Sequence, residues 1–211
     1  MYTIIKDRSP YYITFTFPGL PDIIDYVSKQ TPESVNWFAK YYSHDLLSLE
    51  AAKVVSSMLP MRDKVQSPTT GERGFNLNRM AIFSTPPGGG GGIHKDGIGN
   101  RVSFNIPIQI LDDTCITCWY DDPALDGLMP KENNNYAARA VVPYDKFRFV
   151  MKDYTPVETM IAKPNEMILF NTEIFHSWTN INSLHTRRIL TIRPKDNLTT
   201  FFDDAKKFLF E

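Results

Sequence analysis

The stretch MILFNTEIFHSWTNINSLHTRRILTI (residues 167–192) contains three short runs rich in β-branched and aromatic residues. The runs cover residues 167–170, 174–179 and 188–192, and polar residues that favour turns separate them. Runs of this length between turn residues are typical of β-strands joined by tight turns. The stretch therefore predicts antiparallel β-structure, in which side chains distant in sequence can meet across neighbouring strands.

The same pattern continues toward the N-terminus of the chain. Further runs occupy residues 78–83, 102–110, 115–120, 136–142 and 157–161, with Pro, Gly, Asn and Asp between them. Strands at this spacing are typical of a sandwich or barrel, so we expect a mainly β fold with flanking helices. The length of 211 residues suits one domain over residues 1–211, with its β core at 75–195.

The two ends of the chain are expected to decorate this core. Residues 1–60 contain an aromatic, strand-like run at 11–17. Thr-Pro-Glu at 31–33 predicts a helix start, and the apolar residues between 46 and 59 follow an approximately helical period. A closing helix is predicted at 199–210, with an apolar stripe made of Phe201, Phe202, Ala205, Phe208 and Leu209.

The composition narrows the classes of partner. Lys and Arg total 23 against 24 Asp and Glu, giving a net charge of -1, so no basic excess suggests nucleic acid as a partner. The N-terminus lacks the apolar run of a signal peptide, and no stretch is apolar enough to span a bilayer. Cys115 and Cys118 are too few for a disulfide framework. We expect a soluble, cytoplasmic protein without membrane association.

Three residues form a candidate metal site. His94 and Asp96 are two positions apart, so in an extended chain their side chains leave the same face. His176 lies in a strand-like run, and sheet pairing could bring it beside the first two. Two imidazoles and one carboxylate on one face of iron(II) leave three positions open, as oxygen-activating non-haem iron requires. The alternatives are a turn that Asp96 caps and a strand histidine bonded to a carbonyl.

A second candidate site follows His176. Arg187 and Thr191 are four residues apart in a predicted strand, so they face the same side, whereas Arg188 faces the other. A guanidinium beside a hydroxyl suits a dicarboxylic acid, because the planar fork grips a carboxylate with two hydrogen bonds. The alternation favours Arg187 as the inward residue; the alternative is a surface arginine pair.

Together these residues resemble the 2-oxoglutarate and iron(II)-dependent oxygenase superfamily over residues 78–194. The residues that carry the resemblance are, in order, His94-Lys95-Asp96, Asn105-Ile106-Pro107-Ile108, His176 and Arg187. The chain is similar in detail to the small hydroxylase-like members of phages and marine bacteria, and to the aspartyl/asparaginyl hydroxylase branch. The combination of motifs is far more specific than any one of them.

The resemblance implies a fold, cofactors and an activity. The fold is a double-stranded β-helix, a jelly-roll, cupin-like barrel. His94, Asp96 and His176 are implied as the iron(II) ligands and catalytic residues, and Arg187 as the residue that binds the distal carboxylate of 2-oxoglutarate. Asn105, near the metal-bound carboxylate in that branch, and Thr191 complete the expected co-substrate site. With O2, the implied reaction couples decarboxylation of 2-oxoglutarate to hydroxylation of an unidentified amino acid, peptide or small metabolite.

Two other function classes fit the same residues. A cupin-like protein could bind a metal without oxygenase turnover, because fold alone does not prove catalysis. A zinc-dependent hydrolase could use the same three ligands, and it would keep its activity without oxygen.

Other features receive simpler interpretations. The glycine run at 88–92 is interpreted as a flexible entry to the metal ligands, and His44 and His185 as surface histidines, His44 at a helix start. The acidic loop at 121–135 is interpreted as a lid or a substrate-binding loop, and its acidic start suggests a cationic substrate such as a basic amino acid or peptide.

Overall fold

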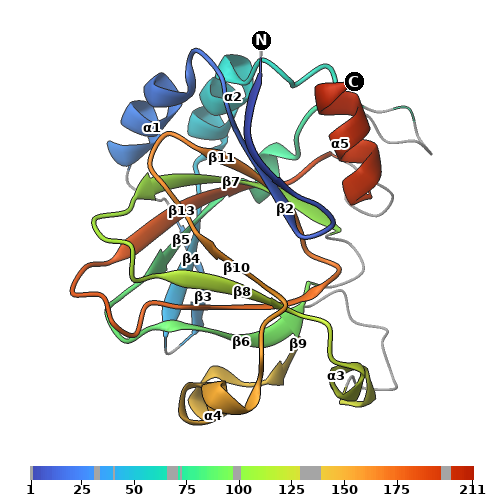
Figure 1. Cartoon of the computed structure of the whole chain (residues 1–211). Helices are drawn as coiled ribbons and strands as arrows, with labels where there is room; N and C mark the ends of the chain where they lie inside the picture. Colours follow the sequence, from blue (N-terminus) through green and yellow to red (C-terminus); the bar gives the residue numbers. More distant parts are fainter. Residues whose placement is uncertain are drawn as a thin grey trace.

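Two antiparallel sheets dominate the protein, seen in a computed structural model (Figure 1). The structure describes residues 2–30, 34–39, 41–65, 71, 73–96, 101–128, 139–195 and 201–211. The expected mainly β fold with a few helices is confirmed. Within the described residues, every helix falls short of the length and hydrophobicity that a membrane span requires.

The larger sheet has eight strands and the smaller one has five. In spatial order the larger sheet contains β1 (Thr3–Arg8), β2 (Tyr12–Thr16), β11 (Met167–Asn171), β7 (Val102–Gln109), β13 (Arg187–Ile192), β5 (Ala81–Thr85), β4 (Tyr42–Leu46) and β3 (Ser34–Ala39). The smaller sheet contains β10 (Glu158–Ile161), β8 (Ile116–Tyr120), β12 (Phe175–Thr179), β6 (Gly90–Lys95) and β9 (Arg139–Val142).

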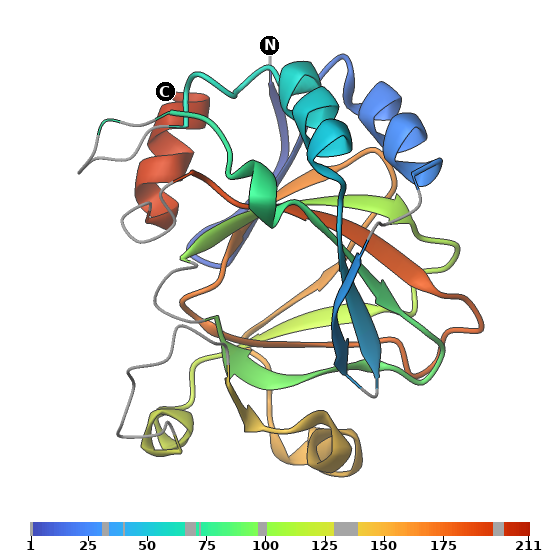
Figure 2. The same cartoon turned by 180° about the vertical axis from the view of Figure 1, so that it is seen from behind.

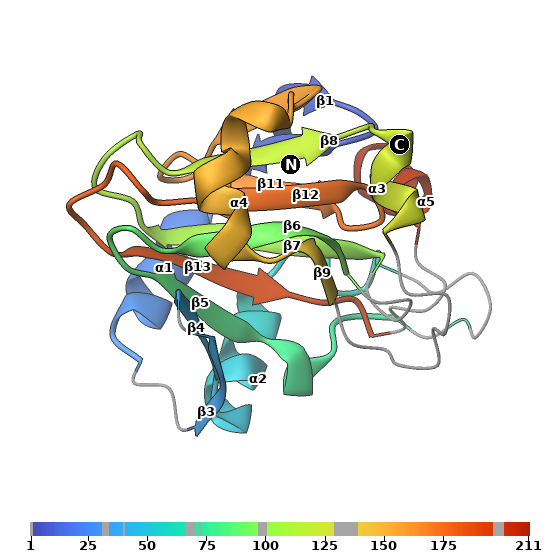
Figure 3. The ribbon, with the colours of Figure 1, turned by 90° about the horizontal axis from the view of Figure 1, so that it is seen from below.

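Helices cover the outer side of each sheet. Figure 2 shows α1 (Leu20–Ser28), α2 (Leu49–Met58) and α5 (Phe202–Phe210) on the outer side of the larger sheet. On the other side of the molecule lie α3 (Pro123–Gly127) and α4 (Tyr144–Val150), and α4 packs against β6 and β9 (Figure 3). Two short 3-10 helices lie at Leu77–Arg79 and Met151–Asp153.

The apolar core is divided by the larger sheet. One cluster, which includes Leu190 and Ile192, packs the outer face of that sheet against the helices. A second cluster joins Ile189 and Phe170 of the larger sheet to Trp119 of the smaller sheet. Successive side chains of a strand point to opposite faces, so the odd-numbered residues of β13 face the space between the sheets.

The N-terminal residues differ from the prediction. The prediction that a helix begins at 31–33 is wrong, because residues 34–39 and 42–46 form strands. Positions 31–33 themselves lie outside the described residues. Pairing of β4 with β5 holds residues 42–46 in a strand instead, whereas the helical period predicted between 46 and 59 is present as α2. A helix begins only at Leu49, where the Ser48 side chain accepts a hydrogen bond from the Ala51 amide at 3.1 Å. The first 60 residues therefore supply four strands of the larger sheet.

The glycine run also differs from the prediction, because Gly90–Lys95 is strand β6 and is mostly buried. Glycine has low strand propensity, so the sequence pattern did not suggest this strand. A Cβ atom at Gly90 would meet the Tyr144 ring, and one at Gly91 would meet the Trp178 ring. These glycines are thus explained by close packing around β6.

At the C-terminus the predicted helix is present, but its buried apolar stripe contains fewer residues than predicted. Phe202, Ala205 and Leu209 are buried, whereas Phe201 precedes the helix and is 45% exposed. The strand predicted at 136–142 is described only from Arg139 onward.

Candidate metal centre

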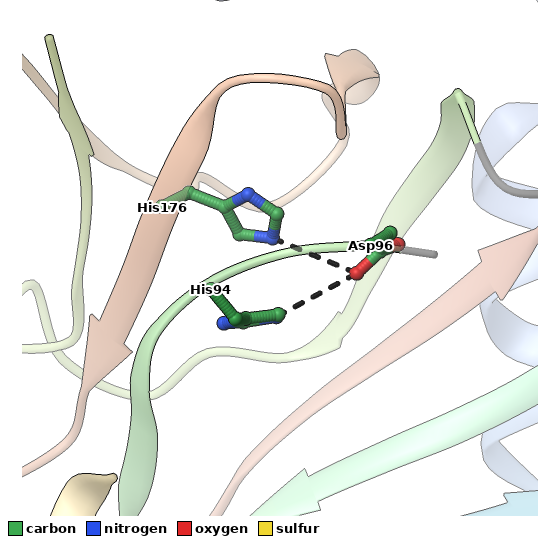
Figure 4. A group of neighbouring side chains, drawn as sticks. All are labelled: His94, Asp96 and His176. Atoms are coloured by element: carbon green, nitrogen blue, oxygen red, sulfur yellow. Dashed lines mark ion pairs between the residues drawn. The ribbon is translucent and has the colours of Figure 1, made fainter. Parts of the chain in front are cut away.

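Strand pairing brings His94 and His176 together. His94 is near the end of β6, and β12 pairs with β6 so that His176 lies opposite His94. Asp96 follows β6, and its amide donates a hydrogen bond to the Thr172 carbonyl at 3.1 Å, which holds the chain end against the segment before β12. Local alternation and sheet pairing together make the three side chains converge (Figure 4).

The three side chains offer one ligand atom each to a common centre. Oδ1 of Asp96 lies 3.6 Å from Nε2 of His94 and 3.8 Å from Nε2 of His176. The two imidazole centroids are 4.3 Å apart. All three potential ligand atoms lie within 4.8 Å of one another, and the side chains are largely buried. This donor set of two nitrogens and one oxygen suits a divalent transition metal.

The other ring nitrogens orient the imidazoles. Nδ1 of His94 is 2.8 Å from the Gly92 carbonyl oxygen, and Nδ1 of His176 is 2.8 Å from the Ile174 carbonyl oxygen. A carbonyl only accepts, so each Nδ1 carries the proton and each Nε2 keeps its lone pair. The pKa of His176 is lowered to about 3, mainly by burial and to a smaller extent by the neighbouring His94. His176 is therefore neutral near pH 7, as a metal ligand must be.

Arg193 holds the second oxygen of the carboxylate. Its Nη2 donates to Oδ2 of Asp96 at 2.5 Å, and its Nη1 donates to the Val102 carbonyl at 3.2 Å. Burial opposes ionisation of Asp96, but Arg193 and the two histidines still bring the pKa of the carboxyl well below its usual range. Arg193 was not among the predicted site residues, although it lies two residues beyond Thr191 and continues the same alternation.

The residues expected to bind the co-substrate lie on the inner face of the larger sheet. Arg187 and Thr191 are on the same side of β13 as Ile189, which packs between the sheets. Asn105 of β7 is directly opposite Thr191. Nε of Arg187 and Oδ1 of Asn105 are buried and have no hydrogen-bond partner in the part of the chain that the structure describes.

One of the simpler interpretations needs correction. The interpretation of His44 as a surface histidine at a helix start is wrong, because it lies in β4, partly buried, with its ring stacked on Phe83 at 4.2 Å. In the acidic loop, Asp122 caps α3 through the Ala124 amide, and Asp126 pairs with Lys95 at 3.0 Å. Positions 129–135 of that loop lie outside the described residues. His185 is exposed, as expected.

Comparisons with known proteins relate the chain to others by fold. No family model and no curated protein matches the sequence. HygX from Streptomyces hygroscopicus, solved with nickel and 2-oxoglutarate bound, aligns with TM-score 0.50 and 11% identity over 87% of this chain and 83% of that one. At this identity the likeness concerns the fold alone.

Two further solved structures are similar at slightly lower scores. A 2OG-Fe(II) oxygenase family oxidoreductase from Burkholderia pseudomallei has TM-score 0.48 and 10% identity over 92% of this chain and 88% of that one. The epimerase SnoN, in complex with Fe3+, alpha ketoglutarate and nogalamycin RO, has TM-score 0.47 and 9% identity over 86% and 78%.

Proposed function

We propose that this protein is a non-haem iron(II) oxygenase that uses 2-oxoglutarate and O2, built on a double-stranded β-helix. The observation that carries the proposal is the convergence of His94, Asp96 and His176 on one point. HygX, which has a similar fold, was solved with nickel and 2-oxoglutarate bound, so this fold can accommodate a metal together with 2-oxoglutarate.

The donor set fits iron(II). Two neutral imidazole nitrogens and one carboxylate oxygen occupy one face of an ion and leave the remaining positions to other ligands. The Nδ1 hydrogen bonds to Gly92 and Ile174 hold both rings in the tautomer that metal binding needs. Arg193 leaves only Oδ1 of Asp96 directed at the histidines.

The inner face of β13 and β7 fits 2-oxoglutarate. An unsatisfied buried donor or acceptor costs about 1–3 kcal/mol, so Nε of Arg187 and Oδ1 of Asn105 favour a ligand that supplies the missing partners. A guanidinium binds a carboxylate with two hydrogen bonds, and Thr191 adds a hydroxyl on the same face. We assign the distal carboxylate of 2-oxoglutarate to Arg187, with Thr191 and Asn105 beside the co-substrate.

The bound iron and 2-oxoglutarate would together supply the activation of oxygen, for which protein side chains have no equivalent. The contribution of the chain is to hold the metal ligands, orient the dicarboxylic acid and exclude water. Water is excluded by the apolar cluster between the sheets, which includes Trp119, Phe170 and Ile189. The reaction proposed is hydroxylation of a small-molecule or peptidyl substrate, as in the aspartyl/asparaginyl hydroxylase branch.

Anaerobic titration of the metal-free protein with iron(II) and then 2-oxoglutarate tests this function. We expect the weak visible charge-transfer band of a chelated keto acid in the wild type and in His185→Ala, whose histidine is exposed. His176→Ala should lose the band. Bound iron without the band would contradict the proposal and favour a cupin-like metal-binding protein. Activity that persists without oxygen would instead favour a zinc-dependent hydrolase.

A further inference from the structure

Four ring side chains from three strands form one continuous surface, here called the aromatic face: Tyr42, His44, Phe83 and Trp178. The His44 ring stacks on Phe83 at 4.2 Å and 13°. Tyr42 lies 6.1 Å from Phe83 and contacts Trp178 edge to face at 5.2 Å. Sheet register explains the arrangement, because His44 and Phe83 are directly opposite each other on β4 and β5.

The aromatic face adjoins the candidate metal centre. The Trp178 ring contacts the ring of His94 at 5.5 Å. The Tyr42 ring contacts the same Trp178 ring, so Trp178 links the aromatic face to His94. A molecule lying on these rings would therefore lie close to one of the candidate metal ligands.

The aromatic face differs from ordinary core packing. All four side chains keep part of their surface exposed, and none belongs to a buried apolar cluster. Among the described residues, the Tyr42 hydroxyl and the His44 ring nitrogens form no hydrogen bond, which leaves polar atoms at the edge of an apolar surface. Trp178 is held in place by a 3.2 Å hydrogen bond from Nε1 to the Thr85 hydroxyl and by its packing over Gly91. The surface is thus preorganised for a ligand.

The ion pair at the adjoining centre favours a neutral ligand. Asp96 and Arg193 neutralise each other in a hydrogen-bonded ion pair. The acidic loop that suggested a cationic substrate uses Asp122 as a helix cap and Asp126 as the partner of Lys95.

We propose that the aromatic face binds a neutral, planar aromatic or heteroaromatic ring of the substrate and presents the adjoining atoms to the metal centre. This inference rests on the proposed function, and it names the substrate class of that site. Aromatic stacking and edge contacts supply the affinity, and the Tyr42 hydroxyl and His44 nitrogens select a ring that carries a hydrogen-bonding group.

Ligand-observed saturation-transfer NMR on the metal-free full chain tests the inference without turnover. The probes are indole, cyclohexanol as a neutral aliphatic ring, and benzylamine as a cationic aromatic. We expect indole to bind best, and Phe83→Leu and Tyr42→Leu each to weaken it about fivefold, since one aromatic contact contributes that order of affinity. Tyr42→Phe, which keeps the ring, should largely retain binding.

Tyr26→Leu is the matched control, because Tyr26 is a partly buried tyrosine of α1 on the outer side of the larger sheet. If either leucine variant fails to fold, His44→Gln tests the same surface with a smaller change. Equal binding of indole and cyclohexanol, or indole binding that none of these substitutions weakens, would overturn the inference. The proposed oxygenase function is tested separately, by the keto acid band. If that band is absent, the oxygenase function fails, but the indole measurement on the metal-free protein still stands.

Discussion

Nη2 of Arg193 donates a hydrogen bond to Oδ2 of Asp96 at 2.5 Å, while Oδ1 of the same carboxylate faces Nε2 of both His94 and His176. One oxygen is therefore committed to the protein and the other is directed at the candidate metal position. Both side chains of the ion pair are largely buried, with 13% and 11% exposed. Arg193 therefore favours metal binding through Oδ1 of Asp96 alone.

Replacing Arg193 should weaken metal binding. Groups that orient a ligand typically account for 10- to 100-fold in metal affinity, so we expect Arg193→Met to raise the Kd for iron(II) by about that factor. Arg193→Lys should recover part of the loss, because it restores the charge without the planar fork. Competition with a chromophoric chelator under anaerobic conditions measures the Kd. Arg8→Met, which removes a long ion pair with Glu158 at 3.9 Å, is the control, and equal iron(II) affinities in both methionine variants would refute the role of Arg193.

The two adjacent arginines of β13 should differ in their effect on 2-oxoglutarate. Arg187 shares the inner face with Ile189, whereas Arg188 shares the outer face with Leu190. Losing a charge-assisted bidentate contact costs about 1.5–3 kcal/mol, so Arg187→Met should raise the KM for 2-oxoglutarate by at least about tenfold. Arg188→Met should leave it nearly unchanged. Steady-state assay of succinate formation checks both, and the opposite ranking would show that the register is shifted by one residue.

Acid should destabilise the metal-free protein through His176. Its pKa in the folded state is about 3, below the usual 6.5, so as pH falls below 6.5 the unfolded chain binds a proton that the folded protein excludes. The contribution of this residue to stability is therefore present above pH 6.5 and declines toward pH 3. Between pH 7 and pH 5 we expect a loss on the order of 1–2 kcal/mol in the free energy of unfolding, measured with urea. His176→Leu should lose clearly less over the same range, and an identical loss would contradict the assignment.

Close packing at β6 makes Gly91 sensitive to the smallest substitution. A methyl group there would collide with the six-membered ring of Trp178, so Gly91→Ala must displace a side chain that also contacts His94. Overpacking of this kind typically costs about 1–3 kcal/mol, and chemical denaturation measures it. Gly127→Ala provides the comparison, because a Cβ at Gly127 meets nothing within 4 Å. Equal stability of the two variants would mean that the Trp178 ring moves away freely.

Sequence analysis was most successful where local periodicity carries the information. Alternation along an extended chain put His94 beside Asp96 and placed Arg187 and Thr191 on the same strand face, and short apolar runs between turn residues indicated most strands of the two sheets. It failed where local preference and tertiary packing disagree. The glycines of β6 read as a loop, and residues 42–46 read as part of a helix, because neither propensity nor period reports the neighbouring strand that stabilises each segment.

By itself, the sequence determined the mainly β class of this protein and which neighbouring side chains share a strand face, because both follow from the two-residue period of an extended backbone. Only the tertiary structure decided which strands pair. That choice brings His176 opposite His94, directs Arg193 to Asp96 and places Tyr42 of β4 against Trp178, whose ring contacts His94. Such contacts join residues far apart in the chain, and they depend on the packing of whole sheets rather than on any local pattern.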